Sequence, residues 1–108
     1  MSVDREAGTP QLPEIDRLIH EPARYNIMAL LFVVGRAEFL FVQNQTRLTP
    51  GNLSAHVSKL EAAQYLLVQK EFVGKKPKTF LKLTRCGRGA FENYHHTMKK
   101  MFSQPLGD

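Results

Sequence analysis

LTPGNLSAHVSKLEAAQY, the stretch from Leu48 to Tyr65, carries the pattern that decides the fold. Its apolar residues recur at intervals of four and three positions, which predicts an amphipathic helix with one buried stripe of Leu53, Val57 and Leu60. Pro50 suits the first helical turn, and Thr49 before it can cap the helix. We therefore expect a helix over about residues 50–63.

The outward face of this helix is small, polar and free of acidic residues before Glu61. It presents Asn52, Ser54, Ala55, His56, Ser58 and Lys59. A face of this kind can lie close in the major groove of DNA, whereas an ordinary solvated helix tends to alternate Glu and Lys. The pattern indicates a recognition helix, and the alternative is a solvated surface without a partner.

The bulk composition is that of one globular domain. The chain has 108 residues, of which 43% are hydrophobic and 23% charged. Its longest apolar run, Ile27–Val34, has eight residues, far fewer than the roughly 20 that span a bilayer. The polar start of the chain does not resemble a signal peptide. We therefore expect a cytoplasmic protein without a membrane segment.

Positive charge is concentrated in the second half of the chain. The net charge is +5, but residues 1–64 hold six Lys or Arg against seven Asp or Glu, and residues 65–108 hold nine against three. Seven of those nine lie within residues 70–88, where Glu71 is the one acidic group. This excess predicts a patch that contacts phosphates, although basic loops also occur in proteins of high pI.

The first half of the chain reads as a series of helices. After a flexible arm at residues 1–13, we expect a short helix in Glu14–His20, a helix from Pro22 that Gly35 ends, an extended piece at Ala37–Phe39 and a short helix at Leu40–Thr46. A tight turn then leads into the central helix. Two helices joined in this way, the second presenting polar groups, form a helix-turn-helix.

After the central helix the pattern changes to that of strands. Leu66–Val73 and Thr79–Thr84 are β-type runs, and the linking Gly74–Lys78 contains Gly, Pro and three lysines. A hairpin that follows a helix-turn-helix is a wing. The predicted fold is therefore α+β and mostly helical: a winged helix-turn-helix at residues 14–102 with a β-hairpin wing and a long C-terminal helix, followed by a tail at 103–108.

The last helix carries an apolar stripe. Thr84 can cap this helix, which should run to about Phe102. Phe91, Tyr94, Met98 and Met101 are spaced 3, 4 and 3 positions apart, as in the a and d positions of two heptads. This spacing predicts a homodimer interface, which Ile15, Leu18, Ile19 and Phe102 can join. The alternative is that the stripe packs on the chain's own first helices.

The segments LTPGNLSAHVSKLEAAQYL, KEFVGKKPKTFLKLT and TRCGRGAF resemble the small winged helix-turn-helix transcriptional regulators of the MarR/ArsR-like superfamily. HEPAR at His20–Arg24 resembles the opening of the first core helix in that group. The resemblance implies a homodimer that binds a short, palindromic operator on double-stranded DNA and usually represses transcription. It places DNA contacts on Thr49, Gly51, Asn52, Ser54, His56, Lys59, Lys75, Lys76 and Lys78.

Two residues depart from the family pattern, because Gln64 and Arg47 stand where Gly is common. Glycine in the first slot ends the recognition helix in a left-handed conformation. Gln64 there should cost about 1 kcal/mol, or the helix ends differently. Arg47 adds a positive charge beside the proposed DNA face.

Other functional classes find less support in the sequence. Glycine-rich phosphate loops, HExxH and GxSxG are absent, so we expect neither catalysis nor a cofactor. Cys86, the single cysteine, lies beside Arg85 near a helix start and offers a redox-sensor alternative. His20, His95–His96 and Cys86 could supply metal ligands across a dimer, but we expect no metal site. A further alternative is a protein-interaction module whose basic hairpin meets an acidic partner.

Overall fold

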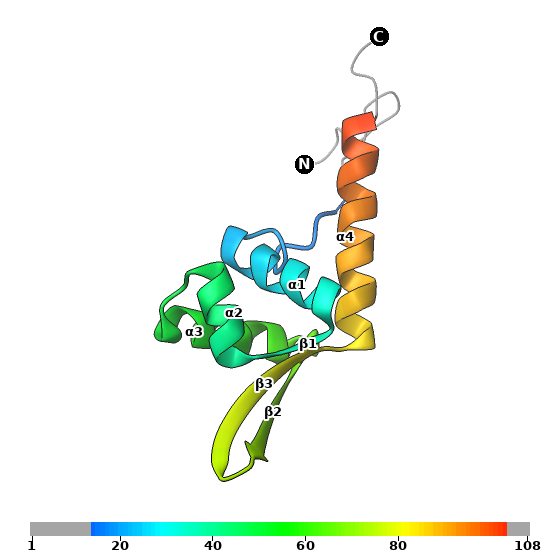
Figure 1. Ribbon diagram of the computed structural model, residues 1–108. Helices are drawn as coiled ribbons and strands as arrows, with labels where there is room; N and C mark the ends of the chain where they lie inside the picture. The colour runs from blue at the N-terminus through cyan, green and yellow to red at the C-terminus, as the bar shows by residue number, and fades with distance from the viewer. Residues whose placement is uncertain (1–13, 104–108) are drawn as a thin grey trace.

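The computed structural model describes residues 14–103, which form four helices and a three-stranded sheet (Figure 1). The predicted arm at 1–13 and all but the first residue of the predicted tail lie outside the described residues. The elements in order are α1 (Pro22–Val34), β1 (Arg36–Glu38), α2 (Phe39–Thr46), α3 (Pro50–Ala62), β2 (Leu66–Val73), β3 (Lys76–Leu83) and α4 (Arg85–Ser103). The predicted winged helix fold is confirmed.

The segment before α1 is a turn, so the predicted helix at Glu14–His20 is wrong. Asp16 explains the difference, because its Oδ1 accepts hydrogen bonds from the backbone N–H groups of Leu18 at 2.9 Å and Ile19 at 3.2 Å. A short acidic side chain that satisfies nearby backbone donors competes with helix formation. The turn places Ile19 in the core, where its side chain is completely buried.

Asp16 also ties this turn to the start of the sheet. Its Oδ2 accepts a hydrogen bond from the Tyr65 hydroxyl at 2.6 Å. Burial of the phenol, together with this carboxylate, raises the pKa of Tyr65 to about 12. The hydroxyl therefore keeps its proton, and with it the hydrogen bond, at all physiological pH values.

α1 begins at the HEPAR motif for local reasons. The Glu21 carboxylate accepts the Arg24 N–H at 2.7 Å and caps the helix, while Pro22 occupies its first turn. At the other end Gly35 adopts a φ of 81°, a left-handed conformation that ends the helix as predicted. The Arg24 side chain folds back and donates from Nε to the Leu18 carbonyl at 2.6 Å. The motif thus joins the N-terminal turn to α1.

α3 closely follows its sequence pattern. Thr49 Oγ1 accepts the Asn52 N–H at 3.1 Å, Pro50 is the first helical residue, and the predicted stripe is buried. Its end is the point where a glycine is usual: Gln64 has a φ of 67°. The Gln64 and Tyr65 N–H groups bond back to the Glu61 and Leu60 carbonyls, which is a Schellman arrangement. Gln64 therefore bears the predicted cost of about 1 kcal/mol.

The turn between α2 and α3 repeats this feature, because Arg47 has a φ of 59° where glycine is common in the resembling family. Arg47 and Gln64, the two departures from the family pattern, thus both adopt the left-handed conformation that glycine would occupy.

The predicted extended piece is β1, which begins one residue earlier than expected. It pairs with β3 in an antiparallel sheet of order β1-β3-β2.

The hairpin is longer and its tip tighter than the sequence indicated. β3 begins at Lys76, not at Thr79, and Val73 lies opposite Lys76 across a two-residue turn of Gly74 and Lys75. Gly74 has a φ of 67°, which a type II′ turn requires at this position. Pro77 is tolerated in β3 because β1 pairs only as far as Phe80, which leaves this part of β3 open on one side.

The core lies between the helices and one face of the sheet. Its completely buried side chains include Ile27, Met28, Leu31, Val42, Leu53, Leu60, Leu66 and Leu81. The wing projects beyond the helices at one end, and the C-terminal half of α4, orange to red, projects beyond α1 at the other (Figure 1). The two extensions leave groups free to meet partners at opposite ends of the domain.

Candidate nucleic-acid interface

The outer face of α3 is exposed and presents the predicted contact residues. Gly51, Asn52, Ser54 and Lys59 are exposed, as is Thr49 at the helix cap. Thr49 Oγ1 accepts the Asn52 N–H, but its own proton remains available for a phosphate. At about 100° per residue, Ser58 lies near the middle of this face, opposite the buried stripe.

His56 is placed differently from the other predicted contacts. It is half-buried at the edge of the face and turned toward α1, where Arg24 Nη1 lies 3.2 Å from its Nδ1. The Glu21 carboxylate lies 4.0 Å from the same nitrogen. His56 therefore joins the α1 cap to α3, and Nε2 is the ring nitrogen left for a nucleic acid. Helical periodicity placed His56 on the polar side but could not show this partner.

The wing lysines fall into two groups. Lys75 and Lys76 are exposed near the tip and form no salt bridge with any residue in 14–103. Lys78 is partly neutralised, because its ammonium lies 3.4 Å from the Glu38 carboxylate of β1. This partner could not be found from the sequence, since it depends on the pairing of β1 with β3.

Lys70 is a candidate that the sequence analysis did not single out. It is exposed on β2, directly opposite Thr79, and shares the sheet face that carries Leu66 and Val68 toward the helices. Side chains alternate between the two faces of a strand, so counting in steps of two from the apolar Leu66 could have placed Lys70 on the helix side of the wing. Lys70 extends the positive charge of the wing along its helix side.

The stripe on α4 is divided between the chain's own core and solvent. Phe91 and Tyr94 are buried, and their rings lie 5.4 and 5.9 Å from that of Tyr25 on α1. Together with the buried Ile19 they form part of the chain's own core, as the alternative for this stripe anticipated. The predicted interface residues that retain exposed surface are Ile15, Leu18, Met98, Met101 and Phe102, of which Phe102 is 86% exposed.

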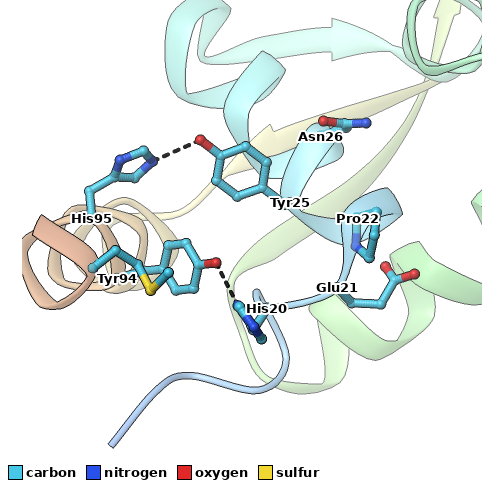
Figure 2. A pocket seen from close by; sticks show the side chains of 8 residues that line it. His20, Glu21, Pro22, Tyr25, Asn26, Tyr94 and His95 are labelled. Atoms are coloured by element: carbon cyan, nitrogen blue, oxygen red, sulfur yellow. Dashed lines mark hydrogen bonds between the residues drawn. The ribbon is translucent and has the colours of Figure 1, made fainter. Parts of the chain in front are cut away.

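An open groove of about 530 Å³ runs between the start of α1 and α4 (Figure 2). One wall is Tyr94, whose hydroxyl is hydrogen-bonded to His20 Nδ1 at 2.8 Å; the other is Tyr25, hydrogen-bonded to His95 Nε2 at 3.0 Å. Met98 also lines the groove. Burial raises the pKa of Tyr94, and the neighbouring Tyr25 adds to this shift. The groove therefore combines aromatic surface with tyrosine hydroxyls and histidine imidazoles.

The sensor alternatives gain little from the geometry. Within residues 14–103 no three His, Cys, Asp or Glu side chains are grouped so that they could hold a metal ion. His20 and His95 are each engaged with a tyrosine. Cys86 is exposed in the first turn of α4.

None of the helices in the described part of the chain combines the length and apolar character needed to cross a membrane.

This chain is similar to known proteins in both sequence and fold. A family model described as a winged helix DNA-binding domain matches residues 23–102. An uncharacterized protein of Methanocaldococcus jannaschii is 35% identical over 78 residues, 72% of this chain and 85% of that protein. The structure of a transcriptional regulator homologue from Pyrococcus horikoshii OT3 matches with a TM-score of 0.76 and 26% identity, over 81% of this chain and 86% of that one.

A more distant likeness is to NadR, solved in complex with 4-hydroxyphenylacetate, with a TM-score of 0.65 and 20% identity. The match covers 80% of this chain and 63% of NadR, and at this identity the likeness is one of fold. The matched region of the family model contains α3, the wing and all but the last residue of α4.

Proposed function

Since this chain belongs to the winged helix DNA-binding domain family and is a DNA-binding transcription regulator, not an enzyme, we propose that it acts as a homodimeric repressor. The dimer acts in the cytoplasm, where each α3 enters a major groove of a two-fold symmetric operator. The two recognition helices are then separated by one helical turn, about 34 Å. The wings grip the flanking phosphates or minor groove.

The observation that carries this proposal is the exposed face of α3. From Asn52 to Lys59 it offers short hydrogen-bonding groups without one carboxylate. Asn52 and Lys59 can donate to base edges or phosphates, and Ser54 can donate or accept. Small residues, Gly51 and Ala55, let the helix axis approach the base pairs closely.

The exposed end of α4 supports the dimer. Met98 and Met101 continue the heptad spacing toward the end of α4, and Phe102 follows directly and is 86% exposed. Burying Phe102 in a partner removes a large apolar side chain from water, worth roughly 2 kcal/mol per copy. Pairing of two α4 ends therefore provides both a driving force and a two-fold axis.

Selection of binding sites from a random duplex pool tests the proposal. The wild-type chain should enrich a two-fold symmetric motif, and an Asn52→Ala/Lys59→Ala variant should lose it because base-edge donors are removed. Glu61→Ala, on the same helix beside this face, is the matched control and should enrich the same motif. A pool without enrichment, together with binding to an acidic protein partner, would favour the interaction-module alternative.

The groove between α1 and α4 favours a second role, the gating of DNA binding by a small aromatic acid. Tyr25 and Tyr94 can pack against an aromatic ring, and the His20 and His95 imidazoles can hydrogen-bond a carboxylate. NadR was solved with a compound of this class. Because the groove joins α1 to the proposed dimer helix, a ligand there can bias the spacing of the two α3 helices.

Thermal unfolding tests the groove with 4-hydroxyphenylacetate as the probe. A saturable rise in Tm and a change in operator affinity are expected for the wild type, because a ligand that binds only the folded state stabilises it. His95→Gln should reduce both effects. His96→Gln is the control, since His96 points about 100° away on α4. An unchanged Tm at millimolar ligand would remove this role.

A further inference from the structure

The two faces of the wing differ in chemistry. Residues directly opposite each other in an antiparallel pair share a face, and successive residues alternate. One face begins in the core with Leu66 opposite Leu83 and continues outward through Lys70 opposite Thr79 to Phe72 opposite Pro77. The other face carries Gln69, Glu71 and Val73. The first face, the helix side, is continuous with the core behind α3.

The second face is already occupied by contacts within the chain. The Arg36 guanidinium lies 3.9 Å from the centroid of the Phe80 ring, donates to Gln69 at 2.8 Å and pairs with Glu71. Lys78 is paired with Glu38 on the same face. The charges of Arg36 and Lys78 are thus balanced by Glu71 and Glu38, whereas Lys76 beside the turn and Lys82 near the core remain exposed on this face.

The helix side of the wing ends in an unpaired aromatic residue. Phe72 is 76% exposed in the outer half of β2, with Pro77 directly opposite it on β3. Its ring is not buried against any residue in 14–103. Pro77 is rigid and has no N–H, and the two side chains of the pair are apolar. A partner that covers this tip would remove both side chains from water.

The charges around Phe72 indicate what that partner is. Lys70 lies on the same face as Phe72, and Lys75 lies in the turn. Lys76 follows at the start of β3, opposite Val73 on the other face, and all three lysines are exposed. The carboxylate of Glu71, the acidic residue in this part of β2, is held by Arg36 on the opposite face. An apolar tip flanked by exposed cations matches duplex DNA, which offers stacked bases between two rows of phosphates.

We propose that Phe72 is an apolar wedge that enters the minor groove beside the operator and partly unstacks one base step there, with Lys70, Lys75 and Lys76 on the adjoining phosphates. This proposal rests on the proposed function and adds a contact whose strength depends on how easily the DNA sequence deforms. Steps that unstack easily, TA and CA/TG, should be preferred where the wing tip lies, at a position where no hydrogen bond reads a base.

Duplexes that carry the selected motif and a single 2-aminopurine at successive flanking positions test the wedge, because this base fluoresces more strongly when it is unstacked. The wild type should raise the fluorescence at one step in each flank. Phe72→Ala should abolish the rise and weaken binding about 10-fold, the loss expected for one stacking aromatic residue. Phe72→Trp should restore the rise, and Val73→Ala, on the opposite face of the same strand, should leave it unchanged.

The outcomes separate the wedge from the proposed function. A wild-type chain that binds the duplex with no change in fluorescence at any flanking position overturns the wedge and leaves DNA binding intact. The same holds if Phe72→Ala gives the full rise. A wild-type chain with no affinity for any duplex overturns both. Far-ultraviolet circular dichroism of each variant shows that the exposed substitutions leave the fold unchanged.

Discussion

A Lys75→Ala/Lys76→Ala variant is expected to bind operator DNA at least about 100-fold more weakly than the wild type in 0.1 M salt. Both lysines are exposed near the wing tip and free of salt bridges within the described residues. A dimer loses four such charges, and each lost phosphate contact removes about 0.9 from the slope of log K against log salt. Fluorescence anisotropy of a labelled duplex at several salt concentrations measures both quantities.

The matched control removes the same charge elsewhere. Lys99 and Lys100 are exposed on α4, away from the wing, so a Lys99→Ala/Lys100→Ala variant has the same net charge as the wing variant. It should keep most of the affinity and nearly the full salt slope. Equal losses in the two variants would mean that net charge alone governs binding and would contradict a specific role for the wing.

Gly87→Ala is expected to lower the free energy of unfolding by about 3 kcal/mol, which in a domain of this size lowers Tm by roughly 10–20 °C. Gly87 lies in the first turn of α4, where a Cβ would come within 2.2 Å of the Tyr65 carbonyl oxygen and 2.9 Å of its carbon. That carbonyl is fixed by the Thr84 N–H at 3.0 Å. Because the obstacle is backbone, α4 or the start of β2 must shift.

Gly89→Ala is the control for this prediction. Gly89 is in the same helix, two residues further on, and an added Cβ meets nothing within 4 Å. Alanine there should raise the free energy of unfolding by about 0.5–1 kcal/mol, because it is the better helix former. Urea unfolding of both variants measures the difference. Two variants of similar stability would contradict the close approach of α4 to Tyr65.

Much of the fold could be predicted because the decisive signals are local. The capping by Thr49, the first-turn Pro50 and the stripe of Leu53 define α3 without reference to the rest of the chain. Gly35 and Thr84 mark helix boundaries in the same way. The left-handed Gln64 could also be anticipated, because it occupies a slot where the resembling family has glycine.

The sequence-based predictions that the structure changed are those that depend on contacts between distant segments. Asp16 replaces a short helix by a turn through its own side chain and through Tyr65. A heptad pattern cannot distinguish a partner from the chain's own α1, so it predicts an interface at Phe91 and Tyr94, which are core residues in the structure. Lys78 meets Glu38 only once β1 joins the sheet.

The salt dependence of binding to the selected operator tests the central claim most directly, that α3 and the wing together bind duplex DNA. We expect log K to fall linearly with log salt, so that K falls about 10³-fold or more between 50 and 200 mM for a dimer making six to ten phosphate contacts. A scrambled duplex should bind at least about 10³-fold more weakly than the operator. An affinity that hardly changes over this range, or equal affinity for both duplexes, would contradict it.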